Sequence, residues 1–173
     1  MRIAEFNALA PRDARALLRS CCGATRWVRE MSARRPYASL ADVLNAAAAV
    51  WEESGPDDWE EAFAHHPRIG EADAEAPVSE TARIWSAGEQ GAVAHAEEQV
   101  RTGLANGNRE YERRFGRIFI VHAAGKTPAE LLETLHGRLS NPPADELRIA
   151  AAEQGKITLQ RLMKLFADEG ANT

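Results

Sequence analysis

Two adjacent histidines precede a proline in the stretch His65-His66-Pro67-Arg68-Ile69-Gly70. Proline disfavours the helical conformation in the residue before it, so we expect a helix to end near His65 and His66 to leave it in an extended conformation. The carbonyl end of a helix favours a nearby positive charge, which would help an imidazole to hold its proton and act as an acid. Basic residues are also common in the last turn of ordinary helices, so a purely structural interpretation stays open.

Ser86, Glu89 and Gln90 form a second group that could do chemistry. The Ser-x-x-Glu spacing is typical of a helix capping box, and on that interpretation Gln90 is a surface residue. A helix N-terminus also offers free N–H groups to an anion. A carboxylate in that first turn could bind a ligand or orient an imidazole, so both interpretations remain.

Arg161 is the third candidate, one turn beyond Ile157 and two turns beyond Gln154 in the last predicted helix. This spacing places it at the border of the apolar face. It is either an arginine whose stem covers the core while its head reaches water, or a forked donor that grips a carboxylate.

The remaining histidines and the two cysteines show no metal-binding pattern. His95 and His136 are expected at a helix surface or border, and His122 is expected to be partly buried in an apolar stretch. Cys21 and Cys22 are neighbours on one predicted helix, where side chains point about 100° apart. We therefore expect two buried free thiols, and the sequence has no nucleotide-binding or serine-hydrolase motif.

Capping residues, prolines and apolar spacing predict seven to eight helices packed as one all-α domain over residues 1–173. Asn106-Gly107-Asn108 is predicted to break the helix that opens at Ser86, and the run 118–121 is predicted to be an extended buried segment, because a lone strand has no partner. The predicted helix starts are Pro11, Thr25 as a cap, Ser39 to Asp42 as a capping box, Pro56, Ser86 to Glu89, Thr127-Pro128 and about Asp145.

The composition narrows the class of protein. The chain has 173 residues, 45% of them hydrophobic, and a formal net charge of −5. An acidic chain without a basic stripe is not expected to bind nucleic acid. No apolar run is long enough to span a bilayer and no secretory signal is seen, so we expect a cytoplasmic protein that does not associate with membranes.

Ordered landmarks along nearly the whole chain resemble the 2-oxo-4-hydroxy-4-carboxy-5-ureidoimidazoline (OHCU) decarboxylase family. They are Asn7-Ala8-Leu9, Cys21-Cys22-Gly23, Trp27, Met31, Ala33-Arg34-Arg35-Pro36-Tyr37, His66-Pro67-Arg68-Ile69-Gly70-Glu71, Ser86, Glu89-Gln90, Asn108, Tyr111, Arg114-Phe115-Gly116, Phe119-Ile120-Val121, Gly125-Lys126, Arg138-Leu139, Asn141, Glu146, Ala150, Glu153, Lys156-Ile157 and Arg161-Leu162.

The resemblance implies an all-α enzyme, often a homodimer, that acts in urate breakdown. It would decarboxylate OHCU to (S)-allantoin without a cofactor or metal. It implies catalytic roles for His66 as proton donor, for Glu89 and for Arg161. It also implies that a second set of residues lines the substrate site: Pro67, Ser86, Gln90, Phe119, Ile120, Val121, His122 and Ala123.

Two positions depart from the family pattern, His122 and Gly88, and either could adjust the pocket. Two other classes of function are also considered. A helical binding module would keep the fold without the reaction, and in it the side chains of His66, Glu89 and Arg161 would point to separate faces. A histidine-based metal hydrolase would contain bound metal after purification.

Overall fold

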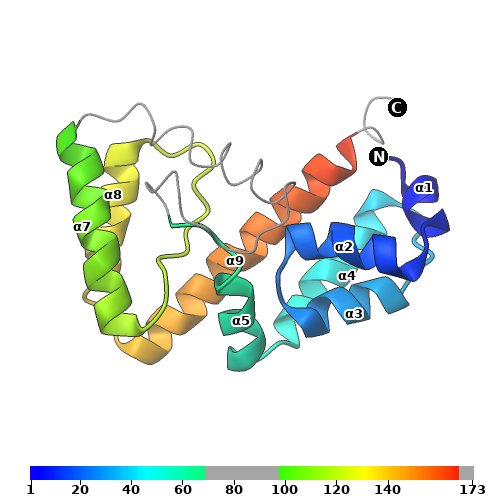
Figure 1. Ribbon diagram of the computed structural model, residues 1–173, viewed down its shortest axis with the longest axis horizontal. Helices are drawn as coiled ribbons and strands as arrows, with labels where there is room; N and C mark the ends of the chain where they lie inside the picture. Colours follow the sequence, from blue (N-terminus) through cyan, green and yellow to red (C-terminus); the bar gives the residue numbers. More distant parts are fainter. Residues whose placement is uncertain (69–97, 168–173) are drawn as a thin grey trace. The chain divides into compact units, whose positions relative to one another are not determined.

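Helices make up the regular structure of the part of the chain that the structure describes. The computed structural model describes residues 1–68 and 98–167, and within these ranges it contains eight helices and no β-strand (Figure 1). They are α1 (Ile3–Ala8), α2 (Pro11–Cys21), α3 (Thr25–Ala33), α4 (Leu40–Glu52), α5 (Pro56–Phe63), α7 (Glu98–Phe115), α8 (Pro128–Arg138) and α9 (Pro143–Leu165). The predicted all-α fold is confirmed. None of these helices is long and apolar enough to cross a membrane.

Capping side chains begin two helices, α4 and α8, where the sequence predicts them. Ser39 Oγ accepts a hydrogen bond from the Asp42 amide at 3.1 Å at the start of α4. At α8, Thr127 Oγ1 accepts from the Glu130 amide at 3.3 Å, and the Glu130 carboxylate accepts from the Thr127 amide at 2.7 Å. This reciprocal bond lowers the pKa of Glu130. Such caps satisfy N–H groups that have no partner within the helix.

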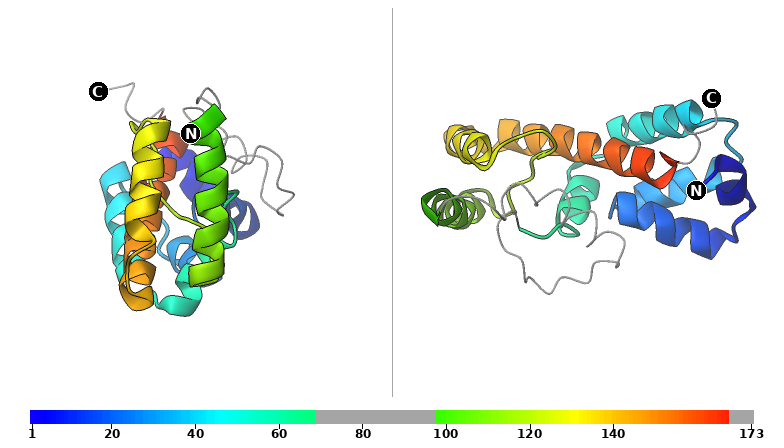
Figure 2. Two further views of the ribbon diagram at one scale, coloured as in Figure 1. Left: turned by 90° about the vertical axis from the view of Figure 1, so that its left-hand side faces the viewer. Right: turned by 90° about the horizontal axis from the view of Figure 1, so that it is seen from above.

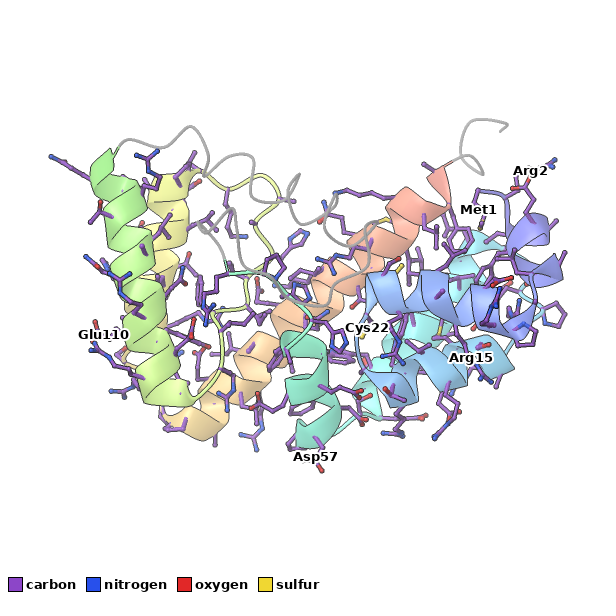
Figure 3. The ribbon with its side chains drawn as sticks, in the orientation of Figure 1. Met1, Arg2, Arg15, Cys22, Asp57 and Glu110 are labelled. Carbon is purple, nitrogen blue, oxygen red and sulfur yellow. The ribbon has the colours of Figure 1, made fainter. Side chains whose placement is uncertain are left out.

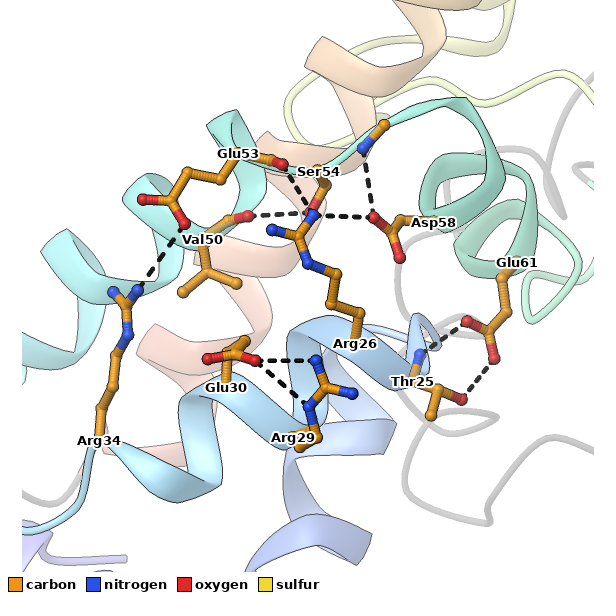
Figure 4. A network of polar contacts seen from close by, with 11 residues as sticks. Thr25, Arg26, Arg29, Glu30, Arg34, Val50, Glu53, Ser54, Asp58 and Glu61 are labelled. Carbon is orange, nitrogen blue, oxygen red and sulfur yellow. Dashed lines mark hydrogen bonds and ion pairs between the residues drawn. The ribbon is translucent and has the colours of Figure 1, made fainter.

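The predicted cap at Thr25 is wrong by one residue. Ala24 is the N-cap of α3 and gives no side-chain bond, while Thr25 is the first helical residue. The amide and the hydroxyl of Thr25 instead donate to the carboxylate of Glu61 on α5, the amide at 2.8 Å (Figure 4). Arg26 donates to Asp58 on the same helix at 3.2 Å. A partner distant in sequence therefore satisfies the start of α3.

The chain divides into two compact units. The first comprises Met1–Ala62 and Gly155–Thr173. In it α2 packs on α3 and α3 packs on α4. Its core is aromatic in part, since Phe6 meets Phe166 edge to face with centroids 5.3 Å apart, and the Trp27 indole donates to the Ala47 carbonyl at 3.2 Å. The predicted burial of Cys21 and Cys22 is confirmed, and both thiols are free. Figure 3 labels Cys22.

The second unit comprises Phe63–Gln154. Here α7 and α8 lie side by side (Figures 1 and 2). A Cβ on Gly107 would lie 2.6 Å from Leu135 Cδ2, and a Cβ on Gly103 would lie 2.9 Å from Leu132 Cδ2. The predicted break at Asn106-Gly107-Asn108 is wrong, because α7 continues through it. Gly107 allows close helix packing, which outweighs its weak helix propensity.

An extended segment joins α7 to α8. Gly116 ends α7 with a φ of 71°, a conformation that favours glycine. Residues 118–123 then form neither helix nor strand, which confirms the prediction made for 118–121. Their apolar side chains complete the core of the second unit, which contains Leu104, Tyr111, Phe115, Phe119, Val121, Ala123, Leu131 and Leu135.

Candidate active site

The turn after α5 holds the histidine that the sequence singles out. The helix ends at Phe63, two residues before the predicted end near His65. The His66 amide donates to the Phe63 carbonyl at 3.0 Å, so His66 closes a last turn before leaving the helix. Pro67 has no N–H and cannot continue this pattern. His66 is half-buried, and its Nε2 atom is shielded from solvent. The predicted helix stop before Pro67 is confirmed.

Arg68 connects this turn to α7 through hydrogen bonds to Glu112. Its Nε donates to Glu112 Oε1 at 2.6 Å and its Nη2 donates to Glu112 Oε2 at 3.0 Å. A forked guanidinium that meets both oxygens of a carboxylate fixes orientation as well as distance. The two side chains are 40% and 27% exposed, so solvent reduces their contribution to stability. The main effect of the Arg68–Glu112 pair is therefore to fix the position of the turn that contains His66 and Pro67.

Charged side chains hold the backbone of the extended segment. The Ile120 carbonyl accepts from Arg138 Nη1 at 2.6 Å, and the His122 amide donates to Glu153 Oε2 at 2.8 Å. Lys126 Nζ donates to the His122 carbonyl at 2.9 Å. Phe119, Ile120, Val121 and Ala123 are buried, whereas His122 is half-buried as predicted. The second unit therefore contains His66, Pro67 and residues 119–123 of the predicted site.

A buried polar network supports this segment from α7, α8 and α9. Arg138 Nε donates to Glu146 Oε1 at 2.8 Å, and Asn141 donates to Glu146 Oε2 at 2.7 Å. The Tyr111 hydroxyl donates to the same carboxylate. Burial, followed by this bond to Glu146, raises the pKa of Tyr111. A buried carboxylate needs such partners, because desolvation of an unpaired charge is costly.

Arg161 belongs to the first unit and is only 2% exposed. The interpretation that its head reaches water at the border of the apolar face is therefore wrong. Its positive charge lies near Cys21 and Cys22 and lowers the pKa of each thiol. Burial has the larger, opposite effect and raises the pKa of Cys21 to about 12 and that of Cys22 to about 11.

Three predicted site residues, Ser86, Glu89 and Gln90, lie outside the described residues, as do His95 and Gly88. The convergence of His66, Glu89 and Arg161 on one site therefore stays a prediction. Within residues 1–68 and 98–167, no three His, Cys, Asp or Glu side chains group as metal ligands.

Lys126, Arg138, Glu146 and Glu153 are landmarks of the family resemblance, and no sequence pattern predicts a role for them. Lys126 binds a carbonyl four residues before it, whereas Arg138 and Glu153 bind backbone groups that are distant in sequence. Arg138 and Glu146, for example, lie on different helices, on either side of Pro142-Pro143. The sequence shows that these residues are charged, but it does not show how far each one is buried.

The landmarks match a known family over almost the full chain. A sequence model described as OHCU decarboxylase matches residues 7–163. The chain belongs to the OHCU decarboxylase family. A solved structure, the OHCU decarboxylase crystallised in the presence of (S)-allantoin, is 34% identical with a TM-score of 0.74, covering 88% of this chain and 98% of that one.

Two curated proteins are similar to this member of the OHCU decarboxylase family. The uric acid degradation bifunctional protein TTL of Arabidopsis thaliana is 38% identical over 149 residues, which are 86% of this chain and 46% of that protein. The uric acid degradation bifunctional protein PucL of Bacillus subtilis is 26% identical over 147 residues, 83% of this chain and 28% of that protein. The chain thus spans less than half the length of either relative.

A second solved structure supports the fold alone. The (S)-allantoin synthase structure is 16% identical, with a TM-score of 0.67, and the match covers 95% of this chain and 54% of that one. The two chains therefore share a helical arrangement although few of their residues are identical.

Proposed function

We propose that this chain decarboxylates OHCU to (S)-allantoin as a step in urate breakdown. The observation that carries the proposal is the family match over residues 7–163, which includes the His66-Pro67-Arg68 turn. The solved relative at 34% identity was crystallised in the presence of (S)-allantoin, the product of the proposed reaction.

The proposed reaction breaks the bond between a ring carbon and its carboxylate and releases CO₂. The electron pair of that bond stays on the ring carbon and delocalises into the conjugated ring. The pair reaches the neighbouring ureido-bearing carbon, while the hydroxyl of the decarboxylated carbon becomes a carbonyl and its proton passes to the ring nitrogen. His66 then delivers a proton to one face of the ureido-bearing carbon, and this new C–H centre makes the product optically active. The chain's own residues supply every group in this scheme, and no cofactor takes part.

The other proposed roles follow the chemistry of each side chain. Glu89 orients the imidazole or the substrate hydroxyl, and Arg161 meets the developing negative charge. Ser86 and Gln90 bind polar groups of the substrate, while Pro67 and residues 119–123 line the site. The burial of Arg161 supports its role, because a guanidinium held away from water interacts more strongly with a charge.

We also propose a homodimer of single-domain protomers that acts in the cytoplasm. Sedimentation of the purified chain tests the dimer. Limited proteolysis tests whether residues 1–173 behave as one domain, since two independent domains would be separated into stable fragments.

The function is tested by circular dichroism with freshly generated substrate. The chain should produce a dichroic signal for (S)-allantoin faster than the substrate decays unaided. His66→Ala should reduce the enzymatic rate at least about 100-fold, as expected for loss of a general acid. Equal rates with the native chain and the variant would exclude the role of His66. A native chain with no effect on the rate would exclude the function and favour the helical binding module.

A further inference from the structure

Two peptide groups meet at Val121, and a charged side chain holds each of them. The first contains the Ile120 carbonyl, which Arg138 binds at 2.6 Å. The second contains the His122 amide, which Glu153 binds at 2.8 Å. In a trans peptide group the C=O and the N–H point to opposite sides. The N–H and C=O of Val121 are therefore directed away from Arg138 and Glu153.

The backbone of Val121 makes no hydrogen bond with residues 1–68 or 98–167, although the residue is only 4% exposed. Buried backbone groups are almost always paired, and an unpaired one is costly. An extended residue that presents a donor and an acceptor on one side matches a ligand that carries both, as an amide or ureido group does.

We propose that Arg138 and Glu153 are positioning residues, which hold the peptide groups on either side of Val121 so that its N–H and C=O face the substrate. This inference rests on the proposed function and adds to it two residues that do not touch the substrate. They act through the backbone of the segment that lines the site.

The surroundings of Arg138 suit this task. Its side chain is buried, and the carboxylate of Glu146, which is fully buried, holds its Nε at 2.8 Å. The guanidinium lies over the Phe119 ring, 4.7 Å from the centroid. One planar group thus bonds to a carboxylate and a carbonyl and stacks on a ring. A lysine ammonium has no fixed fork and cannot keep this geometry.

Glu153 offers the cleaner experiment, because it is half-buried and its glutamine variant keeps an oxygen that can accept from the His122 amide. Glu153→Gln should keep kcat/KM within a few-fold of the native value. Glu153→Leu should lower it about 10- to 100-fold while the protein stays folded, since small misplacements of a site cost this much. Arg138→Lys should show a similar loss. Arg148→Gln is the matched control. Arg148 lies on α9, as Glu153 does, and its side chain is 71% exposed, so this change should not affect kcat/KM.

Amide NMR measures whether the Val121 amide responds to a ligand. If Glu153 only stabilised the fold, replacing it would not change that response. Adding (S)-allantoin to the native chain should shift the Val121 amide resonance, and Glu153→Leu should weaken that response while Glu153→Gln preserves it. Native kcat/KM and a native Val121 response in Glu153→Leu would overturn the positioning role alone. If the native chain is inactive and (S)-allantoin does not shift its Val121 amide resonance, both this role and the proposed function are overturned. Because thermal unfolding is followed in parallel, Glu153→Leu decides the question even if Arg138→Lys does not fold.

Discussion

Arg68 and Glu112 join the turn that carries His66 to α7 through two hydrogen bonds of 2.6 and 3.0 Å. The guanidinium lies two residues after the histidine, so this pair limits how far the turn can move. Because both partners are partly exposed, the contact is expected to affect geometry more than stability.

Glu112→Gln should lower kcat/KM about 10-fold and change the free energy of unfolding by less than about 1 kcal/mol. The amide keeps the size of the carboxylate but removes its charge and one of its acceptor oxygens. Steady-state kinetics and urea denaturation measure the two effects. Glu110→Gln, an exposed change on the same helix, is the control and should alter neither (Figure 3). Unchanged kinetics in Glu112→Gln would show that the pair does not help to place the turn.

The rate of (S)-allantoin formation should fall as the pH rises and the His66 imidazole loses its proton. An acid that must deliver a proton is active only in its protonated form, and imidazoles titrate between about pH 5 and 8. A pH profile of kcat/KM checks this, with His66→Ala as the comparison. A native rate that stays flat from about pH 6 to about pH 9 would argue against a charged acid.

Gly107→Ala should destabilise the protein by about 1–3 kcal/mol, because the added Cβ would come 2.6 Å from Leu135 Cδ2. Gly137→Ala on the facing helix α8 provides the matched control, since a Cβ there meets nothing within 4 Å. That change should stabilise the protein by about 0.5–1 kcal/mol through helix propensity. Thermal and urea unfolding of the two variants should give shifts of opposite sign, and equal shifts would contradict the packing argument.

Stability should decline at alkaline pH because the two buried thiols resist ionisation in the folded state. Their pKa values rise from 9.0 to about 12 for Cys21 and about 11 for Cys22. Above pH 9 the unfolded chain loses these protons while the folded chain keeps them, so unfolding becomes easier as the pH rises. Each thiol should remove about 1.4 kcal/mol per pH unit between its unfolded and folded pKa values. This stabilisation is complete below pH 9 and is lost by about pH 11 to 12.

Replacing both cysteines by alanine should flatten this decline, as measured by urea unfolding between pH 8 and pH 11. The double variant will lose some stability at neutral pH through the smaller side chains, so the slope with pH is the quantity to compare. An unchanged slope would show that other groups cause the alkaline loss.

Local signals in the sequence predicted local structure well. Ser39 and Thr127 mark helix starts through side-chain bonds to the amide three residues ahead, and Pro11 does so through its fixed φ. The structure has helices that begin there. Pro67 likewise predicted the end of α5 to within two residues. Helix α1, which is only six residues long, is not among the predicted helices.

Predictions that depended on distant partners were less successful. Thr25 was expected to cap its own helix, but Glu61 binds it instead. Gly107 was expected to break a helix that packing against Leu135 preserves. Arg161 was placed at a helix border but is buried. Each outcome depends on a side chain far away in sequence, which neither propensity nor periodicity represents.

Gly103 and Gly107 also limit how relatives of this protein can be recombined. They lie one turn apart on α7, and Leu132 and Leu135 of α8 occupy the space where their side chains would be. A foreign α7 with larger residues at these positions would collide with the leucines, and a foreign α8 with smaller residues would leave voids. The two helices are therefore best exchanged between homologues as one cassette, with crossover points outside residues 98–138.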